Sequence, residues 1–123
     1  MKTILIVDDE PGILAGLSAR LEANGYNVLE ASDGIEALKK ARSSIPDLII
    51  LDLMLPKMDG YKVARLLKYD NRYSQIPILI LSARGQDSDK EMGKSAGADD
   101  FMVKPFDSAD LLSRIERLIK EVP

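Results

Sequence analysis

The stretch Leu48-Ile49-Ile50-Leu51-Asp52 decides the fold of this chain. Its apolar residues do not alternate with polar ones, a pattern typical of strands that are buried on both faces of a parallel sheet. The runs Ile4–Val7 and Ile78–Leu81 have the same character. With Tyr26–Ala31 and Phe101–Val103 they make five predicted strands, and the more polar Tyr26–Ala31 is expected at an edge of the sheet.

Stretches with the helical spacing of apolar residues fill the gaps between these strands. Asn24-Gly25 is a stop signal for the first helix, and Asp33 with Glu36 forms a capping box at the start of the second. The apolar positions are Ile13, Leu14, Leu17 and Leu21; Leu38 and Ala41; Val63, Leu66 and Leu67; and Leu111, Leu112, Ile115, Leu118 and Ile119. Short connections and strand–helix alternation predict a single doubly wound α/β domain over residues 1–123, with no output domain in this chain.

The stretch 87–96 is predicted to be a helix that buries little. Ser88 and Glu91 are its expected capping residues, and Met92 and Ala96 are nearly its only apolar side chains. So thin an apolar stripe predicts one of the least stable elements of the domain. The sequence allows two interpretations, a solvated surface helix and a movable face.

Composition excludes several classes of function. The chain has no cysteine and no histidine, which excludes disulfides, thiol chemistry and histidine-based catalysis. A net charge of −3 and the lack of a Lys/Arg run predict no direct binding to nucleic acid or to a membrane surface. The N-terminus is neither a signal peptide nor a membrane span, so a cytoplasmic location is expected by default.

Acidic residues follow two of the predicted strands. Asp8 and Asp9 come after the first strand, and Asp52 comes after the third. If the strand order is 2-1-3-4-5, these strands are neighbours where the order reverses, and the three carboxylates converge. Converging carboxylates raise a pKa or require a cation, and without His or Cys a hard ion such as Mg²⁺ or Mn²⁺ is favoured. Any one of these residues, taken alone, is better explained as a helix N-cap or a solvated loop residue; only the three together favour a metal site.

Two further residues are expected at the same rim. Ser82 ends the fourth strand and Lys104 ends the fifth. A carboxylate nucleophile, a hydroxyl donor and a compact cation at consecutive strand ends form a constellation suited to phosphoryl transfer. Each of the two residues by itself is weak evidence, because exposed Ser and Lys are common.

The chain resembles the response-regulator receiver family from about Thr3 to Ile119. The motifs that carry the resemblance are residues 7–10 (Val-Asp-Asp-Glu), 47–56, 58–60 (Met-Asp-Gly), 81–83 (Leu-Ser-Ala), 97–101 and 104–106 (Lys-Pro-Phe). The resemblance implies a flavodoxin-like fold with strand order 2-1-3-4-5. It implies a phosphorylation-activated switch of a two-component system, served by a sensor histidine kinase or a phosphotransfer protein. Such a protein is not an enzyme in the usual sense, since it catalyses only its own phosphorylation and slow dephosphorylation.

The resemblance also implies a role for each residue at the rim. Asp52 is the implied phosphoacceptor, and Lys104 the partner of the phosphoryl group or, before phosphorylation, of Asp52. The implied Mg²⁺ ligands, with Mn²⁺ as a substitute, are Asp9, Asp52, the backbone carbonyl of Met54, and Asp8 largely through bound water.

A switch pair completes the resemblance. Ser82 would move to the phosphoryl oxygen and Phe101 would turn inward with it. The family more often has Tyr at this position, and Phe has no phenol that could form a hydrogen bond. How the change is transmitted to a partner is therefore left open. The alternative to a switch role is that Phe101 is simply an aromatic residue at the edge of the core. The Lys104–Pro105 peptide bond is expected to be cis.

Residues 81–85 and 111–115 are similar to receivers of the winged-helix transcription-factor subgroup. Those receivers dimerise through the fourth helix, fifth strand and fifth helix, which corresponds here to the face 87–121. The matching charge pairs are Lys90 with Asp110, and Asp99 or Asp100 with Arg114. Glu121 stands where the subgroup usually has a basic residue, so a solvated charged face remains an alternative.

Three other functions remain open at the level of sequence. A Mg²⁺ phosphohydrolase with an Asp nucleophile often has a second Asp two residues later, where this chain has Met54. An interaction module that is never phosphorylated would not need the intact set of rim residues. A flavin-binding relative would need a phosphate loop rich in Ser, Thr and Gly, whereas residues 8–10 are all acidic.

Overall fold

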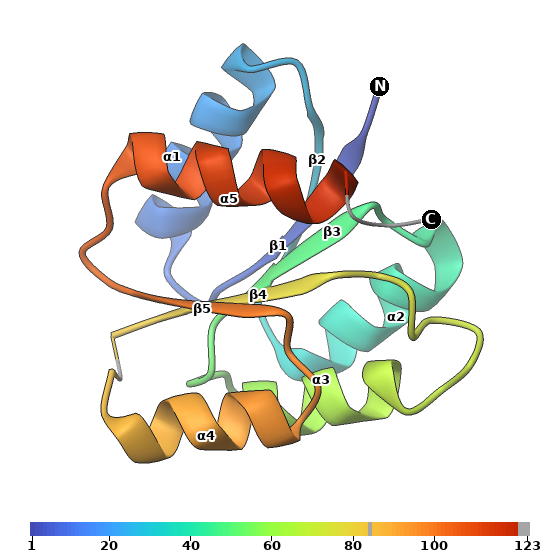
Figure 1. Cartoon of the computed structure of the whole chain (residues 1–123). Coiled ribbons are helices and arrows are strands. Elements are labelled where there is room, and N and C mark those ends of the chain that lie inside the picture. The colour runs from blue at the N-terminus through green and yellow to red at the C-terminus, as the bar shows by residue number, and fades with distance from the viewer. Residues whose placement is uncertain (84, 121–123) are drawn as a thin grey trace.

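The structure is a computed structural model that describes residues 1–83 and 85–120. Five parallel strands form one sheet, and a helix follows each of them (Figure 1). The strands are β1 (Thr3–Val7), β2 (Asn27–Ala31), β3 (Leu48–Leu51), β4 (Ile78–Ser82) and β5 (Asp100–Val103). The helices are α1 (Pro11–Ala23), α2 (Gly34–Ser44), α3 (Gly60–Lys68), α4 (Asp87–Ser95) and α5 (Ser108–Lys120). The strand order β2-β1-β3-β4-β5 confirms the predicted doubly wound fold.

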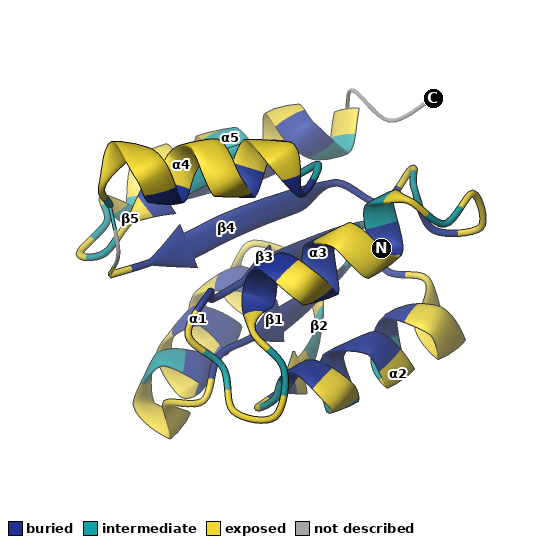
Figure 2. Cartoon of the chain, turned by 90° about the horizontal axis from the view of Figure 1, so that it is seen from below, coloured by how far each residue is buried: buried dark blue, intermediate teal, exposed yellow. Residues whose placement is uncertain are grey.

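Helices cover both faces of the sheet, with α1 and α5 on one face and α2, α3 and α4 on the other (Figure 1). Within β3, Ile49 packs into the core under α2 and α3, and Ile50 packs into the core under α1 and α5. The central strands are therefore buried on both faces, as the dark ribbons of Figure 2 show. This burial explains why their sequences are continuously apolar.

The first edge strand is β2, as its polar sequence predicts. Asn27 and Glu30 are exposed, Val28 and Leu29 are half-buried, and only Ala31 is buried. The strand begins at Asn27 rather than at Tyr26, and its partner in register is Thr3 of β1. The other edge strand, β5, begins at Asp100, one residue before the predicted start.

The ends of α1 and α2 follow their sequence signals. Asn24 ends α1, and Gly25 takes a φ of +89° that suits a residue without a side chain. Asp33 caps α2 by accepting a hydrogen bond of 2.8 Å from the backbone N–H of Glu36. The Glu36 carboxylate accepts from the N–H of Ser32, one residue earlier than in the predicted capping box.

One predicted apolar position of α3 is wrong. Leu66 is 39% exposed, whereas Val63, Ala64 and Leu67 are buried. Neighbouring residues of a helix point about 100° apart, so Leu66 and Leu67 do not share the inward face. The buried stripe instead extends back to Tyr61.

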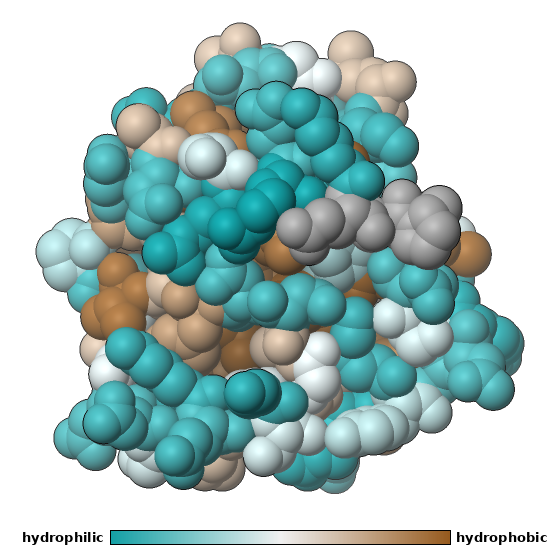
Figure 3. All heavy atoms as spheres, viewed as in Figure 1, coloured by the Kyte–Doolittle hydropathy of each residue, from teal (hydrophilic) through white to brown (hydrophobic). Residues whose placement is uncertain are grey.

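The helix α4 buries fewer residues than any other described helix, as predicted, but its details differ. Gln86 is the N-cap and makes no side-chain capping bond, so the expected capping by Ser88 is wrong. Met92 is 48% exposed, while the inward side chains are Asp89 and Ala96. Most of the ribbon of α4 is exposed in Figure 2, and its surface is hydrophilic in Figure 3. Within the described ranges, no helix has the length and apolar character needed to cross a membrane.

Candidate functional site

The predicted convergence of carboxylates is present at the carboxyl ends of β1 and β3. The two strands are paired with Val7 opposite Leu51, so the residues that follow them lie side by side. Carboxylate oxygens of Asp8, Asp9 and Asp52 all lie within 4.8 Å of one another. Asp8 and Asp52 are buried, and Asp9 is exposed at the mouth of the cluster.

Lys104 reaches the cluster from the end of β5. Its ammonium donates a hydrogen bond of 2.7 Å to Oδ2 of Asp8 and lies 3.6 Å from Oδ2 of Asp52. The structure thus brings Lys104 to the expected place, but its shorter contact is with Asp8 and not with Asp52. The other oxygen of Asp8 accepts a 3.0 Å bond from the N–H of Glu10, which orients the carboxylate.

The environment of Asp52 opposes its ionisation. Burial raises the pKa of Asp52 and is the largest influence; the charge of Lys104 lowers it and that of Asp8 raises it again. Smaller lowering contributions come from the N–H of Met54, 3.4 Å from Oδ1, and from a hydrogen bond with the Ser82 side chain. The net result is a raised pKa, as expected for a carboxylate whose burial disfavours the charged form more than its neighbours favour it.

The environment of Lys104 favours its charged form. Burial alone would lower the pKa of Lys104, but the hydrogen bond to Asp8 and the charges of Asp52, Asp8 and Glu10 outweigh it, so this pKa is raised. Lys104 is therefore a permanent cation at neutral pH, held beside two buried carboxylates.

The donor set of the cluster fits Mg²⁺. All three side chains offer carboxylate oxygen, the hard ligand that Mg²⁺ prefers. Opposite ligands of an octahedral Mg²⁺ lie about 4 Å apart, so a spread of up to 4.8 Å needs only small side-chain adjustments. The fully buried Ser82 ends β4 beside this rim, where the sequence predicted it.

The predicted switch residue Phe101 lies on β5 against α4. Its side chain is half-buried and packs against the core under α2 and α3. A methyl group placed on Gly93 of α4 would come within 2.9 Å of Ile80 and 3.4 Å of the Phe101 ring, so α4 rests directly on this ring. The Lys104–Pro105 bond is cis, as the resemblance implied.

Four of the five candidate dimer residues, Asp99, Asp100, Asp110 and Arg114, have partners within the protomer. Arg114 donates to Asp100 at 3.0 Å and to Asp110 at 3.2 Å. Asp99 accepts from Lys68 at 2.9 Å, and its same oxygen accepts from the N–H of Ile78. Lys90 is exposed on α4. Arg84 and Glu121, which the subgroup resemblance also used, lie outside the described residues.

Sequence reasoning missed three contacts around this rim. Asp33 pairs with Lys57 at 3.5 Å, and Tyr61 binds Asp89 in the interior. Gly60 packs against the backbone of Asp52, since a methyl group on it would lie 2.4 Å from the Asp52 carbonyl oxygen. Only the glycine carried a usable signal, because it belongs to the Met-Asp-Gly motif that follows the third strand.

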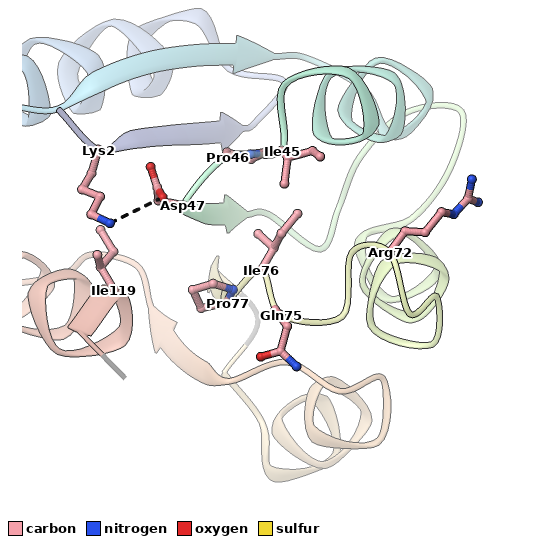
Figure 4. Close-up of a pocket in the computed structure, with 9 residues that line it drawn as sticks. All are labelled: Lys2, Ile45, Pro46, Asp47, Arg72, Gln75, Ile76, Pro77 and Ile119. Carbon is pink, nitrogen blue, oxygen red and sulfur yellow. Dashed lines mark ion pairs between the residues drawn. The ribbon is translucent and has the colours of Figure 1, made fainter. Parts of the chain in front are cut away.

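A separate hollow lies at the opposite edge of the sheet (Figure 4). It has a volume of about 260 Å³ and includes the Lys2–Asp47 ion pair, drawn as a dashed line. Its lining residues are Lys2, Ile45, Pro46, Asp47, Arg72, Gln75, Ile76, Pro77 and Ile119. Several of them immediately precede β1, β3 and β4, so the hollow is at the amino ends of the strands, away from the acidic cluster.

Comparisons with known proteins agree with this geometry. The family model "Response regulator receiver domain" matches residues 4–116. The DNA-binding dual master transcriptional regulator RpaA of Synechocystis is 48% identical over 120 residues, which cover 98% of this chain and 50% of the regulator. The alkaline phosphatase synthesis transcriptional regulatory protein PhoP of Bacillus subtilis is 46% identical over 97% of this chain and 49% of its own length. The chain thus spans about half the length of the curated relatives it matches.

Solved structures give the same result. A putative response regulator from Chloroflexus aurantiacus superposes with a TM-score of 0.93 at 36% identity, covering 98% of each chain. The receiver domain of the sensor histidine kinase PA1611 from Pseudomonas aeruginosa, which has a magnesium ion coordinated in its active-site cleft, superposes with a TM-score of 0.90 at 33% identity, also covering 98% of each chain. The chain belongs to the response regulator receiver domain family, the switch modules of two-component signalling.

Proposed function

We propose that Asp52 is the residue on which this receiver domain is phosphorylated. The observation that carries the proposal is the convergence of Asp8, Asp9 and Asp52 on one rim with Lys104 among them. A carboxylate oxygen of Asp52 attacks the phosphorus of a phosphohistidine or a small acyl phosphate. The bond from phosphorus to the donor breaks, and its electron pair leaves with the donor's imidazole or carboxylate.

The residues around Asp52 each have a part in this transfer. Lys104 neutralises charge on the incoming phosphoryl oxygens and keeps Asp52 and Asp8 from repelling each other. The hydroxyl of Ser82, at the end of β4, donates to a phosphoryl oxygen after transfer. Met54 stands where an Asp-nucleophile phosphohydrolase often has its second Asp, so we propose that the protein acts as a switch and not as a multi-turnover hydrolase.

Receiver domains bind Mg²⁺ in an acidic pocket. In this chain the proposed ligands are Asp9, Asp52 and the carbonyl of Met54, with Asp8 acting largely through water, and Mn²⁺ is proposed as a substitute. The bound ion supplies charge neutralisation for the phosphoryl oxygens and orients them toward Asp52. The proposal is supported by the oxygen-only donor set and its spacing.

The proposed output is a movement of the α4–β5–α5 face. An aspartyl phosphate shifts a two-state element only through contacts that differ between the states. Ser82 and Phe101 are the proposed pair that makes this difference, because Ser82 ends β4 beside the site and Phe101 lies on the neighbouring β5, opposite Ile80. Displacement of α4 should cost little free energy, since this helix buries few apolar side chains. It also rests on Phe101 through Gly93, so a movement of Phe101 would act on it directly.

Partners of the whole protein are part of the same proposal. A sensor histidine kinase or a phosphotransfer protein is the proposed phosphodonor, with all partners in the cytoplasm. Although RpaA is described as DNA-binding, we propose that residues 1–123 themselves do not bind nucleic acid, given their net charge of −3. A homodimer through the α4–β5–α5 face would pair Lys90 with Asp110 of a second copy, and sedimentation before and after phosphorylation tests for it.

Phosphorylation of the purified protein tests the central proposal. With Mg²⁺ and acetyl phosphate, the mass should increase by one phosphoryl group, and the adduct should be labile to hydroxylamine as an acyl phosphate is. Asp52→Ala should show no increase, whereas Asp59→Ala, a carboxylate at the far end of the same loop, should still be modified. Equal modification of Asp52→Ala would show that another residue is the acceptor.

A further inference from the structure

The loop between β3 and α3 carries Met54, the proposed backbone ligand of the metal, and both of its ends are fixed. At its start, the N–H of Met54 approaches the Asp52 carboxylate at 3.4 Å. At its end, the N–H of Gly60 donates a 2.9 Å bond to the carbonyl of Leu53. The loop is therefore folded tightly back on the phosphorylation site.

The middle of this loop adopts an unfavourable backbone conformation. Lys57 has a φ of +69°, in the left-handed region that side chains disfavour. The N–H of Met58 donates a 2.8 Å bond to the carbonyl of Pro56, which makes a γ-turn centred on Lys57. Conformations of this kind persist only where surrounding contacts hold them.

The first turn of α2 supplies those contacts. The carboxylate of Asp33 lies 3.5 Å from the Lys57 ammonium, and the N–H of Gly34 donates to the Pro56 carbonyl at 3.4 Å. A methyl group on Gly34 would lie only 2.5 Å from the backbone oxygen of Met58. The helix can approach the loop so closely only because residue 34 has no side chain.

We infer that Asp33 and Gly34 are positioning residues that hold the β3–α3 loop in the shape that presents Met54 to the metal. The inference rests on the proposed function, because it concerns the affinity of the proposed Mg²⁺ site. Neither residue reaches the reacting atoms. The competing explanation is that Asp33 serves only as the N-cap of α2, where it accepts the bond from Glu36.

Replacing Asp33 by Asn separates these two roles. Asn remains a good N-cap but removes the charge that pairs with Lys57. The matched control is Asp59→Asn, because Asp59 caps α3 through a 3.0 Å bond from Lys62 and lies on the same loop. Both changes remove one negative charge near the site, so the difference between them isolates the contact with Lys57.

Mg²⁺ affinity of the unphosphorylated protein, measured by calorimetry, is the primary readout. Asp33→Asn should weaken it about two- to fivefold more than Asp59→Asn does, the size expected for one exposed ion pair. The phosphorylation rate with acetyl phosphate should fall by the same factor at low Mg²⁺ and recover at saturating Mg²⁺. Equal effects of the two variants would overturn the inference.

The Lys57→Gly variant tests whether Asp33 acts by holding Lys57 in its left-handed conformation. Glycine adopts a positive φ without strain, so in Lys57→Gly the loop no longer needs Asp33. Adding Asp33→Asn to Lys57→Gly should then weaken Mg²⁺ affinity no more than adding Asp59→Asn does. A loss as large as in the wild-type background would show that Asp33 acts in another way, and would also overturn the inference.

The glycine is tested in the same assay. Gly34→Ala should weaken Mg²⁺ binding about tenfold, because its methyl group must displace the Met58 backbone. The control Gly16→Ala, on the open side of α1, should not change it, since nothing lies within 4 Å of that position. A wild-type protein that neither binds Mg²⁺ nor accepts phosphate would refute the proposed function itself, and the inference with it.

Discussion

The phenol of Tyr61 on α3 donates a hydrogen bond to the buried carboxylate of Asp89 on α4, with 3.1 Å between the two oxygens. The same hydroxyl lies 3.2 Å from the backbone carbonyl of Asp89. Because α4 buries few apolar side chains, this polar contact is a main attachment of α4 to the rest of the domain.

Loss of this contact should destabilise the protein. Tyr61→Phe keeps the ring but leaves the buried Asp89 with one donor fewer, so the free energy of unfolding should fall by about 1–2 kcal/mol in urea titrations. Tyr69→Phe is the control: its hydroxyl also bonds to α4, at Ser95, but Tyr69 is 71% exposed. The control should change stability by less than about 0.5 kcal/mol. Equal losses would mean that burial of the contact is unimportant.

A side chain at position 60 should be costly. A methyl group there would lie 2.4 Å from the Asp52 carbonyl oxygen and 2.7 Å from Leu53 Cα, and backbone cannot move aside cheaply. Gly60→Ala should therefore lower the free energy of unfolding by about 3 kcal/mol, measured by urea titration. Gly16→Ala should raise it by about 0.5–1 kcal/mol through helix propensity. An unfolding curve for Gly60→Ala that overlays the wild type would contradict the close packing of Gly60 on the Asp52 backbone.

The raised pKa of Asp52 makes a prediction about pH. Its folded-state pKa lies above the ordinary value of 3.8, so between these two values the folded protein binds more protons than the unfolded chain. Stability from this group is therefore full below pH 3.8 and is lost as the pH rises through the folded-state pKa. Asp52→Asn, without metal, should be more stable than the wild type at pH 7 by on the order of 1 kcal/mol.

Measuring the stability difference between Asp52→Asn and the wild type at several pH values distinguishes an effect of charge from an effect of packing. The advantage of Asp52→Asn should shrink as the pH falls toward 3.8, where the wild-type carboxyl is protonated in both states. The exposed Asp87 at the start of α4 is the control, and Asp87→Asn should give no such gain. An Asp52→Asn advantage that is independent of pH would point to packing and not to charge.

Binding of Mg²⁺ should stabilise the fold. At tenfold its Kd, a ligand specific for the folded state adds about 1.4 kcal/mol to the free energy of unfolding. Thermal unfolding with increasing MgCl₂ should show this gain, and MnCl₂ should give a similar one. Asp9→Asn, which removes a proposed ligand at the mouth of the site, should abolish most of it, and chelation by EDTA should reverse it. A rise in Tm that Asp9→Asn shares fully would place the ion elsewhere.

Replacement of Lys104 should slow phosphoryl transfer. Lys104→Met removes the one cation that contacts Asp8 and Asp52 in the described part of the chain, so phosphorylation by acetyl phosphate should slow about 100-fold. Lys90→Met, an exposed position on α4, should leave the rate unchanged. The initial rate of mass increase is the measurement, and a rate for Lys104→Met near that of the wild type would remove Lys104 from the proposed mechanism.

The sequence by itself determined the architecture and the composition of the site. The short, β-branched apolar run Leu48–Leu51 favoured a strand buried on both faces, and the position of Asp52 directly after it predicted the edge of the sheet at which the residue lies. These features follow from the local pattern of apolar residues and from the rule that the carboxyl ends of parallel strands lie at the same edge of a sheet. Neither requires knowledge of the distances between atoms.

Tertiary structure alone decided which neighbours each charged group contacts. Lys104 binds Asp8 more closely than Asp52, and Arg114 binds Asp100 within its own protomer. Such choices depend on differences of about an ångström between atoms distant in sequence, and no local pattern records them. The same holds for the approach of Gly34 to Met58, which becomes visible only when α2 is placed against the loop.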